Sequence, residues 1–273
     1  MTAMNSAAAT FETIALSIEA GIARVTLKRP EVRNAFNEAV IAELTTVFAQ
    51  LGDDDSVRAI VLAAEGKAFC AGADLNWMKS MASYSWEENK ADAGRLAQML
   101  WTIYRCPQPV IARVQGDAYA GGVGLLAVCD IVVAVDTAGF CLSEAKLGLL
   151  PATIAPYVVR ALGEQASRRY FVTAERFSAQ EAHRLGLVHE LTSADSIDEK
   201  IATLLGAISA NGPAAVRACK RLVQDVAHQA ITAELRDDTA RRIADIRASD
   251  EGREGVQSFL GKRAPNWLPS SKD

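Results

Sequence analysis

The sequence predicts an α/β fold, with a mainly parallel sheet in the first part of the chain and a helical region after it. Two observations support this prediction. Strand-like segments alternate with loops and helices through the first half, which is typical of parallel strands joined by crossover helices. From residue 197 onward the apolar pattern is helical, with no further strand signal. A chain of 273 residues therefore fits one main domain with an appendage.

The first half of the chain opens with a hairpin. Apolar residues alternate from Phe11 to Leu27 around the turn Glu19-Ala20-Gly21, which predicts two paired strands. Apolar residues then recur at helical spacing over 40–51, until Gly52. The other elements predicted in this half are the strands 58–63, 110–114 and 131–135 and the helices 86–104 and 123–128.

The second half is mostly helical. Ser178-Ala-Gln-Glu181 is a capping-box pattern that predicts a helix ending near Gly186, and a short strand is expected at 187–191. Because the later helices are too few to enclose a core, we expect them to pack on the main domain or on a second subunit. They are predicted at 197–210, 213–227, 231–248 and 251–260. The predicted division is a leader at 1–10, a core at 11–195 and a helical C-terminal region at 196–273.

Composition and charge narrow the class of protein. The hydrophobic fraction is 50% and the charged fraction 23%, the usual balance of a soluble globular protein. The net charge is −4 and the basic residues are scattered, whereas nucleic-acid binding needs a concentrated cationic surface. The longest apolar stretch, residues 125–134, contains Asp130 and falls short of the roughly 20 residues of a membrane span. We therefore expect neither a nucleic-acid nor a membrane partner.

The cysteines and the N-terminus indicate the compartment. Five cysteines, an odd number without a CxxC pair, predict reduced thiols. Residues 1–10 lack the positive charge and the apolar run of a secretory signal and are predicted to be a flexible leader. The sequence therefore predicts a cytoplasmic protein.

Two familiar catalytic patterns find no support. The histidines at 183, 189 and 228 lack the spacing and acidic neighbours of a metal site, so we predict structural roles for them and no bound metal. No GxSxG segment is present, and the surroundings of Ser143 do not form a nucleophile elbow.

A dinucleotide fingerprint is a weak alternative. Gly122-Val-Gly124-Leu-Leu-Ala127 matches GxGxxA, and Glu144 follows Gly124 by 20 residues. The fingerprint requires its first glycine at the turn from strand to helix, but here residues 115–121 intervene. A test of NAD binding would discriminate this dehydrogenase hypothesis.

Two loops rich in alanine and glycine, 67–75 and 116–124, each lie between a strand and a helix. Small residues let a ligand approach the backbone, and the free N–H groups at a helix N-terminus point outward. Two such loops that face one spot would form an oxyanion hole for a polarised carbonyl. For either loop alone, tight packing is the simpler interpretation.

The sequence as a whole resembles the crotonase, or enoyl-CoA hydratase/isomerase, superfamily, over about Phe11 to Trp267. The segments that carry the resemblance are 27–36, 67–75, 116–130, 140–151, 179–188 and 259–263. The resemblance implies a spiral of ββα units as the catalytic core, a helical C-terminal trimerisation region and assembly as a trimer or hexamer. It also implies an acyl-CoA substrate, with coenzyme A as part of the substrate and no separate cofactor.

The resemblance also assigns roles to residues of this chain. The backbone N–H groups of Ala73 and Gly121 would hold the thioester oxygen, and Glu144 would be the catalytic carboxylate. The positions that match coenzyme A contacts in the family are Val32, Arg33, Ala35, Ala71, Asp74, Leu75 and Lys262. For Arg29, a nearby cation, a solvated surface role is equally compatible with the sequence.

The second glutamate of the family's hydratases falls on Gly124, which we expect to leave space for a water or for a distal carboxylate of the substrate. We also expect burial against Leu142, Leu147 and Leu150 to raise the pKa of Glu144. The segments 141–156 and 169–177 look like bacterial methylglutaconyl-CoA hydratases of leucine or isoprenoid degradation.

The sequence therefore predicts a hydratase that adds water to a 2-enoyl-CoA, with 3-methylglutaconyl-CoA as one branched candidate. An isomerase that shifts the double bond with Glu144 as its single base is the first alternative. A non-catalytic acyl-CoA-binding protein is the alternative from another class.

Overall fold

The computed structural model describes residues 11–268 of the chain. The predicted leader at 1–10 lies outside the described residues.

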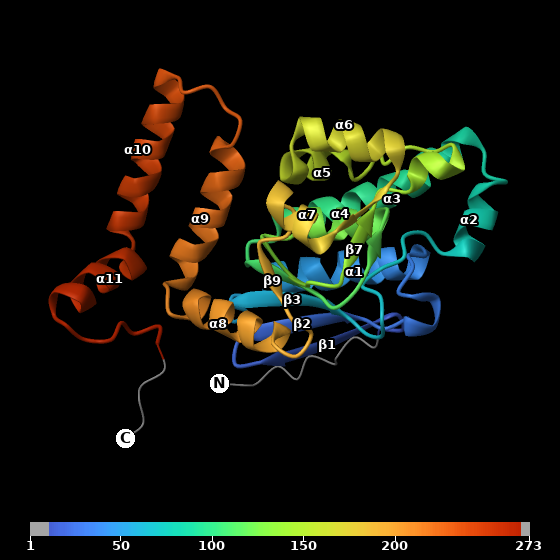
Figure 1. Ribbon diagram of the computed structural model, residues 1–273. Helices are drawn as coiled ribbons and strands as arrows, with labels where there is room; N and C mark the ends of the chain where they lie inside the picture. The colour runs from blue at the N-terminus through green and yellow to red at the C-terminus, as the bar shows by residue number, and fades with distance from the viewer. Residues whose placement is uncertain (1–10, 269–273) are drawn as a thin grey trace.

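A six-stranded sheet forms the centre of the molecule, in the order β1-β2-β3-β4-β6-β9. Its strands are β1 (Ile14–Glu19), β2 (Ile22–Leu27), β3 (Ala59–Ala64), β4 (Val110–Val114), β6 (Ile131–Val135) and β9 (Glu190–Thr192). β1 and β2 form the antiparallel hairpin, and every later pairing in this sheet is parallel. The α/β fold with a mainly parallel sheet is therefore confirmed (Figure 1).

A second, three-stranded sheet consists of β5 (Ala118–Tyr119), β7 (Gly139–Cys141) and β8 (Arg176–Ser178). The sequence did not predict it, because strands of two or three residues are too short for an alternating pattern. β5 and β7 are parallel, whereas β7 and β8 are antiparallel. This small sheet places the segment before residue 121 beside the segment before residue 144.

Two long helices cover one face of the main sheet. α1 (Glu38–Gly52) packs against α3 (Trp86–Arg105), and Asn37 caps α1 by accepting a hydrogen bond from the N–H of Val40. All six residues of β3 are buried, as expected for a central parallel strand that is covered on both faces.

The remaining helices of the core are short: α2 (Leu75–Met81), α4 (Gly121–Ala127), α5 (Ala155–Leu162), α6 (Glu164–Thr173) and α7 (Ala179–Leu185). The sequence predicted α4 and α7 but not α2, α5 or α6. α7 has the predicted cap at Ser178 and ends at Gly186. α4 begins two residues before the predicted start, since glycines carry no apolar periodicity. The predicted strand at 187–191 is wrong in its first part, because Leu187 and Val188 are buried in a loop before β9.

The last four helices divide into two groups. α8 (Ile197–Ser209) packs against β3, β4 and β6, and it buries Ile197 and Ile201 in the core. α9 (Pro213–Val226), α10 (Ala233–Ala248) and α11 (Asp250–Leu260) form an arm that projects from the core (Figure 1). The predicted boundary at 195/196 thus precedes a helix that belongs to the packed core. The arm leaves apolar side chains such as Phe259 82% exposed.

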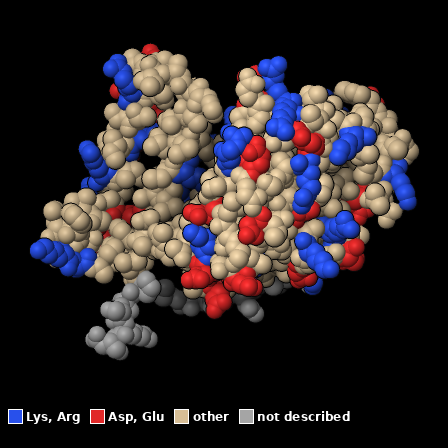
Figure 2. Space-filling view, in the orientation of Figure 1, with Lys and Arg blue, Asp and Glu red and all other residues tan. Residues whose placement is uncertain are grey.

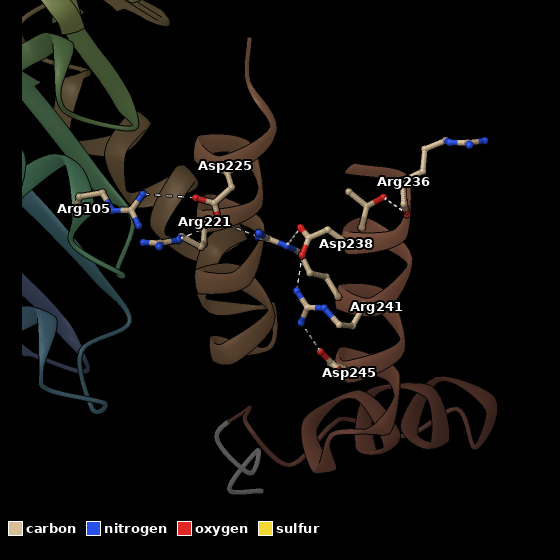
Figure 3. Close-up of polar contacts among 9 residues, drawn as sticks. Arg105, Arg221, Asp225, Arg236, Asp238, Arg241 and Asp245 are labelled. Carbon is tan, nitrogen blue, oxygen red and sulfur yellow. Dashed lines mark hydrogen bonds and ion pairs between the residues drawn. The ribbon is translucent and has the colours of Figure 1, made fainter. Parts of the chain in front are cut away.

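Polar contacts join the arm to itself and to the core. Asp225 of α9 pairs with Arg221 on the same helix, with Arg242 of α10 and with Arg105 of α3 (Figure 3). Lys220 of α9 lies 2.6 Å from Asp130 in the core. The arm is therefore attached to the core largely by charged groups.

The surface and the thiols agree with the composition. On the face shown in Figure 2, basic and acidic side chains are interspersed over the core. All five cysteines are free thiols, as predicted. Within residues 11–268, no helix combines the length and the apolar character that a bilayer span requires.

Candidate active site

Hydrogen bonds bring the two small-residue loops together. The N–H of Tyr119 donates to the carbonyl of Cys70 at 2.9 Å, and the two segments form a short parallel bridge there. Gly72 packs against the other loop, since a Cβ added to Gly72 would lie 3.1 Å from the Cβ of Ala120. The loops 67–75 and 116–124 therefore face each other, as the sequence predicts.

The N–H of Ala73 is left free by the way its loop pairs. Phe36 pairs with the loop by donating its N–H to Gly72 and accepting from the N–H of Asp74, both at 2.7 Å. Successive backbone groups of an extended segment point to opposite sides, so the N–H of Ala73 points away from Phe36. It donates to no other residue in the part of the chain that the structure describes.

The N–H of Gly121 is free because it begins α4. The first N–H groups of a helix have no partner in the preceding turn, and among the described residues this one finds no other. Ala120 turns the chain into the helix with φ 48° and ψ −118°, an unfavourable conformation of the kind that persists at functional sites. A Cβ on Gly121 would lie 2.8 Å from Phe36 Cε2, so the aromatic ring packs directly on the glycine.

Glu144 begins a 3-10 turn, η2 (Glu144–Leu147), that follows β7. The N–H of Ala120 donates to the carbonyl of Cys141 at 2.8 Å, so this turn starts close to the N-terminus of α4. Within the described chain, Glu144 Oε2 is buried and has no hydrogen-bond partner. Burial raises the pKa of Glu144, against the opposing effect of a backbone hydrogen bond.

The expected cause of that shift needs correction. Leu142 is buried, but Leu147 and Leu150 are 59% and 74% exposed in this chain. Side chains as exposed as these bury little of a neighbouring carboxyl, so they contribute little to the burial that raises the pKa of Glu144.

The expectation of an open space at Gly124 is wrong. A Cβ added to Gly124 would lie 2.2 Å from Ile154 Cγ2, and Ile154 is itself buried. The side chain of Ile154, which directly precedes α5, fills the place that a side chain at 124 would need. Buried apolar packing therefore takes the place of the second glutamate, and Glu144 is the one catalytic carboxylate of the pair that this chain keeps.

Several of the residues assigned to coenzyme A lie together. Val32 ends a 3-10 turn, η1 (Pro30–Val32), and Arg33 follows it as an exposed cation. The N–H of Ala71 donates to the carbonyl of Arg33 at 2.9 Å, which places loop 71–75 beside residues 32–35. Leu75 is 74% exposed at the start of α2, whereas Ala35 is buried.

Asp74 and Arg29 form an ion pair that the sequence did not predict. Arg29 Nη2 lies 2.9 Å from Asp74 Oδ2, and Asp74 Oδ1 accepts from the N–H of Asn76 as the cap of α2. Burial alone would raise the pKa of Asp74, but the hydrogen bonds from Arg29 and Asn76 outweigh it and lower the pKa below its usual value. The carboxylate of Asp74 is thus engaged within the protein, and Arg29 is not a solvated surface cation.

Lys262 is not brought to these loops within one chain. It lies two residues after the end of α11, which packs on α9 and α10. Figure 1 shows α11 and α2 at opposite sides of the molecule. A contact between Lys262 and a ligand at Arg33 therefore requires a second subunit.

The glycines of the dinucleotide fingerprint serve internal packing. A Cβ on Gly122 would lie 2.7 Å from the carbonyl oxygen of Cys70, and Gly124 packs on Ile154. Neither glycine leaves its backbone open to a pyrophosphate. The residues described also include no group of three His, Cys, Asp or Glu side chains placed to hold a metal ion.

Comparison with known proteins decides the family. The family model described as enoyl-CoA hydratase/isomerase matches residues 17–269. The chain belongs to the enoyl-CoA hydratase/isomerase family. It is therefore an enzyme of the crotonase superfamily, as the sequence resemblance implied.

Other members of the hydratase/isomerase family are similar to this chain over nearly its whole length. A crystal structure of an enoyl-CoA hydratase from Shewanella pealeana has a TM-score of 0.92 and 40% identity, covering 94% of this chain and 97% of that one. The enoyl-CoA hydratase structure from Mycobacterium smegmatis has a TM-score of 0.89 and 37% identity, covering 94% and 99%. The enoyl-CoA hydratase ACTT6 of Alternaria alternata is 35% identical over 257 residues, 91% of this chain and 82% of that protein.

The sequence did not predict three features of the site: the packing of Ile154, the Arg29–Asp74 pair, and Asn34, whose side chain hydrogen-bonds to Arg29, Glu65 and Ala68. Their roles depend on contacts between segments far apart in the chain, which no local pattern records. The one local signal was Asn34, a residue type that tolerates the left-handed conformation it adopts here, with φ 54°.

Proposed function

We propose that this protein hydrates 2-enoyl-CoA thioesters, with Glu144 as the only carboxylate that moves protons. The observation that carries the proposal is that neighbouring, hydrogen-bonded segments hold three groups free to act on a substrate. These are the buried, unpartnered Oε2 of Glu144 and the free N–H groups of Ala73 and Gly121. Two free N–H donors on facing loops and one carboxylate of raised pKa suit acid–base chemistry next to a polarised carbonyl.

The reaction follows from this arrangement. The two N–H groups hold the thioester oxygen, which makes the β-carbon electrophilic. Ionised Glu144 takes a proton from water while the water oxygen bonds to the β-carbon, and the π electrons move through the α-carbon onto the thioester oxygen as an enolate. Glu144 then delivers the proton to the α-carbon as the carbonyl re-forms. One water is added, and Glu144 ends in its starting state.

A double-bond isomerase is the second candidate, and the packing of Ile154 on Gly124 favours it. An isomerase removes a proton from one carbon and returns it to another, so one carboxylate is sufficient. The packing of Ile154 on Gly124 leaves no second acid or base there to activate a water molecule. Glu144, Ala73 and Gly121 would serve both reactions.

The finer assignments are part of this proposal. The segment 141–156, which resembles methylglutaconyl-CoA hydratases, supports a branched substrate such as 3-methylglutaconyl-CoA and a place in leucine degradation. The exposed apolar side chains of the arm support a homotrimer or hexamer. The free cysteines support a place in the reducing cytoplasm. Coenzyme A enters as part of the substrate, and the proposed steps use no further cofactor.

The test measures the turnover of crotonyl-CoA and of a 3-enoyl-CoA by three proteins: the wild-type protein, Glu144→Gln and the control Glu199→Gln. Glu199 is an exposed residue of α8. Hydration is measured by the loss of enoyl thioester absorbance, and isomerisation by its appearance. We expect Glu144→Gln to lose about 10²- to 10⁴-fold in kcat and to keep acyl-CoA binding, because general acid–base groups contribute that much.

The outcomes separate the hypotheses. Near-wild-type kcat in Glu144→Gln would overturn the mechanism. Isomerisation without hydration in the wild-type protein would replace the hydratase by the isomerase. Binding of both thioesters without turnover would leave an acyl-CoA-binding protein.

A further inference from the structure

Arg29 joins the two segments that flank the free N–H of Ala73. Its side chain is only 18% exposed. Nη1 donates to the carbonyl oxygen of Ala35 at 2.7 Å, and Nη2 donates to Asp74 Oδ2 at 2.9 Å. One guanidinium therefore holds a backbone group and a side chain that lie about 40 residues apart in sequence.

The turn that presents Arg29 is itself fixed. The N–H of Arg29 donates to Asn34 Oδ1 at 2.9 Å, and the N–H of Asn34 donates back to the carbonyl of Arg29 at 2.8 Å. Asn34, 1% exposed, also donates through Nδ2 to the carbonyls of Glu65 and Ala68. The guanidinium thus starts from a turn that is hydrogen-bonded to the loop after β3.

Both residues that the Arg29 guanidinium contacts are sequence neighbours of the oxyanion site. Asp74 is next to Ala73, and Ala35 is next to Phe36. Asp74 directly follows Ala73, so a fixed Asp74 carboxylate restrains the backbone on the C-terminal side of the residue with the free N–H. Ala35 directly precedes Phe36, whose backbone pairs with Gly72 and Asp74 and whose ring packs on Gly121. The contacts of Arg29 therefore reach Ala73 through Asp74 and Gly121 through Phe36.

We infer that Arg29 is a positioning residue for the oxyanion site. By holding Ala35 and Asp74, it makes the N–H groups of Ala73 and Gly121 converge on one oxygen. The inference rests on the proposed function, because it assigns that oxygen to the thioester carbonyl. A guanidinium suits this role since its planar fork donates two hydrogen bonds in fixed directions, whereas a lysine ammonium is a point charge. Displacing a reacting group by about 1 Å can cost about 10²-fold in rate.

The experiment compares Arg29→Met, Arg29→Lys and Asp74→Asn with the control Arg113→Met. Arg113 of β4 matches Arg29 in exposure, 19%, and donates two hydrogen bonds to Asp198 at 2.8 and 2.7 Å. Its partner lies on α8, away from both loops. Unfolding by denaturant shows which variants are folded, and the kinetics are measured on those.

The decisive readout is the carbonyl stretching frequency of bound butyryl-CoA, labelled with ¹³C at the thioester carbon. This thioester is saturated, so the protein cannot hydrate it, and the frequency falls as hydrogen bonds polarise the carbonyl. We expect Arg29→Met to lose most of the wild-type frequency shift and about 10- to 100-fold in kcat for crotonyl-CoA, with a small change in KM. The frequency shift and kcat of Arg29→Lys should lie between those of Arg29→Met and the wild-type protein. Arg113→Met should match the wild-type protein in both.

Each outcome decides the inference. A folded Arg29→Met protein with the wild-type carbonyl shift would overturn it, even with a lower kcat, because the loss would then arise elsewhere. If Arg29→Met is not recovered folded, Asp74→Asn decides in the same way, since asparagine keeps the size and the helix cap but loses the charge. A wild-type protein that leaves the carbonyl frequency unshifted would instead overturn the proposed oxyanion site itself.

Discussion

Ile154 occupies the space that a side chain at Gly124 would need, with its Cγ2 atom 2.2 Å from the position of a Cβ there. Both residues are buried, so this contact belongs to the core beneath the site. The fold therefore fills the position of a second carboxylate with an apolar side chain. A glutamate added at 124 has no open space to enter.

The first prediction concerns the stability of this contact. Gly124→Ala should destabilise the protein by about 1–3 kcal/mol, because overpacking a close-packed core forces its neighbours to move. Gly94→Ala is the matched control, since Gly94 lies exposed in α3 with nothing within 4 Å of an added Cβ. That change should be neutral or stabilising by up to about 1 kcal/mol. Denaturant unfolding measures both, and equal effects of the two substitutions would contradict the packing argument.

The same contact predicts that Gly124→Glu alone does not improve hydration. The pair Gly124→Glu with Ile154→Ala should bind acyl-CoA and unfold at higher denaturant than Gly124→Glu, because the smaller residue makes room. Rates with crotonyl-CoA and unfolding midpoints check this prediction. A faster hydratase from the single substitution would show that Ile154 moves freely.

The pH dependence of the rate should report Glu144. Burial raises the pKa of this carboxyl above its ordinary value of 4.5, and the proposed step needs it ionised. The rate should therefore fall as the pH is lowered through the raised pKa, so the acid limb of kcat/KM should lie above pH 4.5. Glu199→Gln should keep this limb and Glu144→Gln should lack it. An acid limb at or below the ordinary value would speak against Glu144 as the titrating base.

The attachment of the arm should depend on Lys220. Its ammonium, 7% exposed, lies 2.6 Å from Asp130 Oδ2, which also accepts from the N–H of Val110 at 2.7 Å. Because the Asp130 side chain is 28% exposed, Lys220→Met should cost about 1–3 kcal/mol, less than the loss of one partner from a fully buried ion pair. The surface pair of Lys200 with Glu190 is the control, and Lys200→Met should cost less than about 1 kcal/mol.

Adding Asp130→Asn to Lys220→Met separates the causes. If the cost comes from a partly buried carboxylate that has lost its ion pair, the double variant should recover part of the stability that Lys220→Met loses. Burial already raises the pKa of Asp130 while Lys220 opposes the shift. A double variant less stable than Lys220→Met would contradict this explanation.

Lys262 should act on the site of another subunit. Lys262→Ala should raise KM for CoA thioesters more than it lowers kcat, since a phosphate contact is shared by ground state and transition state. Co-expression with Glu144→Gln then distinguishes the two geometries. If Lys262 acts between subunits, mixed assemblies contain sites with Glu144 from one chain and Lys262 from the other. Those sites should show the wild-type KM. A KM that stays raised in every mixture would place Lys262 in the site of its own chain.

Local patterns in the sequence determined most of the main sheet and the longer helices. The strands at 110–114 and 131–135 match β4 and β6, because buried β-branched runs bounded by turn residues leave few alternatives. α7 is marked by its cap at Ser178 and by Gly186, since capping depends on neighbouring residues alone. The small-residue loops were also visible, because closely approached backbone requires alanine and glycine. The strands of the second sheet were not, because two or three residues carry no period.

Tertiary structure alone decided how the site is completed. The freedom of the Ala73 N–H depends on its pairing with Phe36, and the wall at Gly124 depends on Ile154 from a later segment. Arg29 could be a surface cation in the sequence, but the fold places Asp74, 45 residues later, against its guanidinium. Residue types restrict which contacts are possible. Which of them form depends on the close packing of segments distant in the chain, which local composition does not encode.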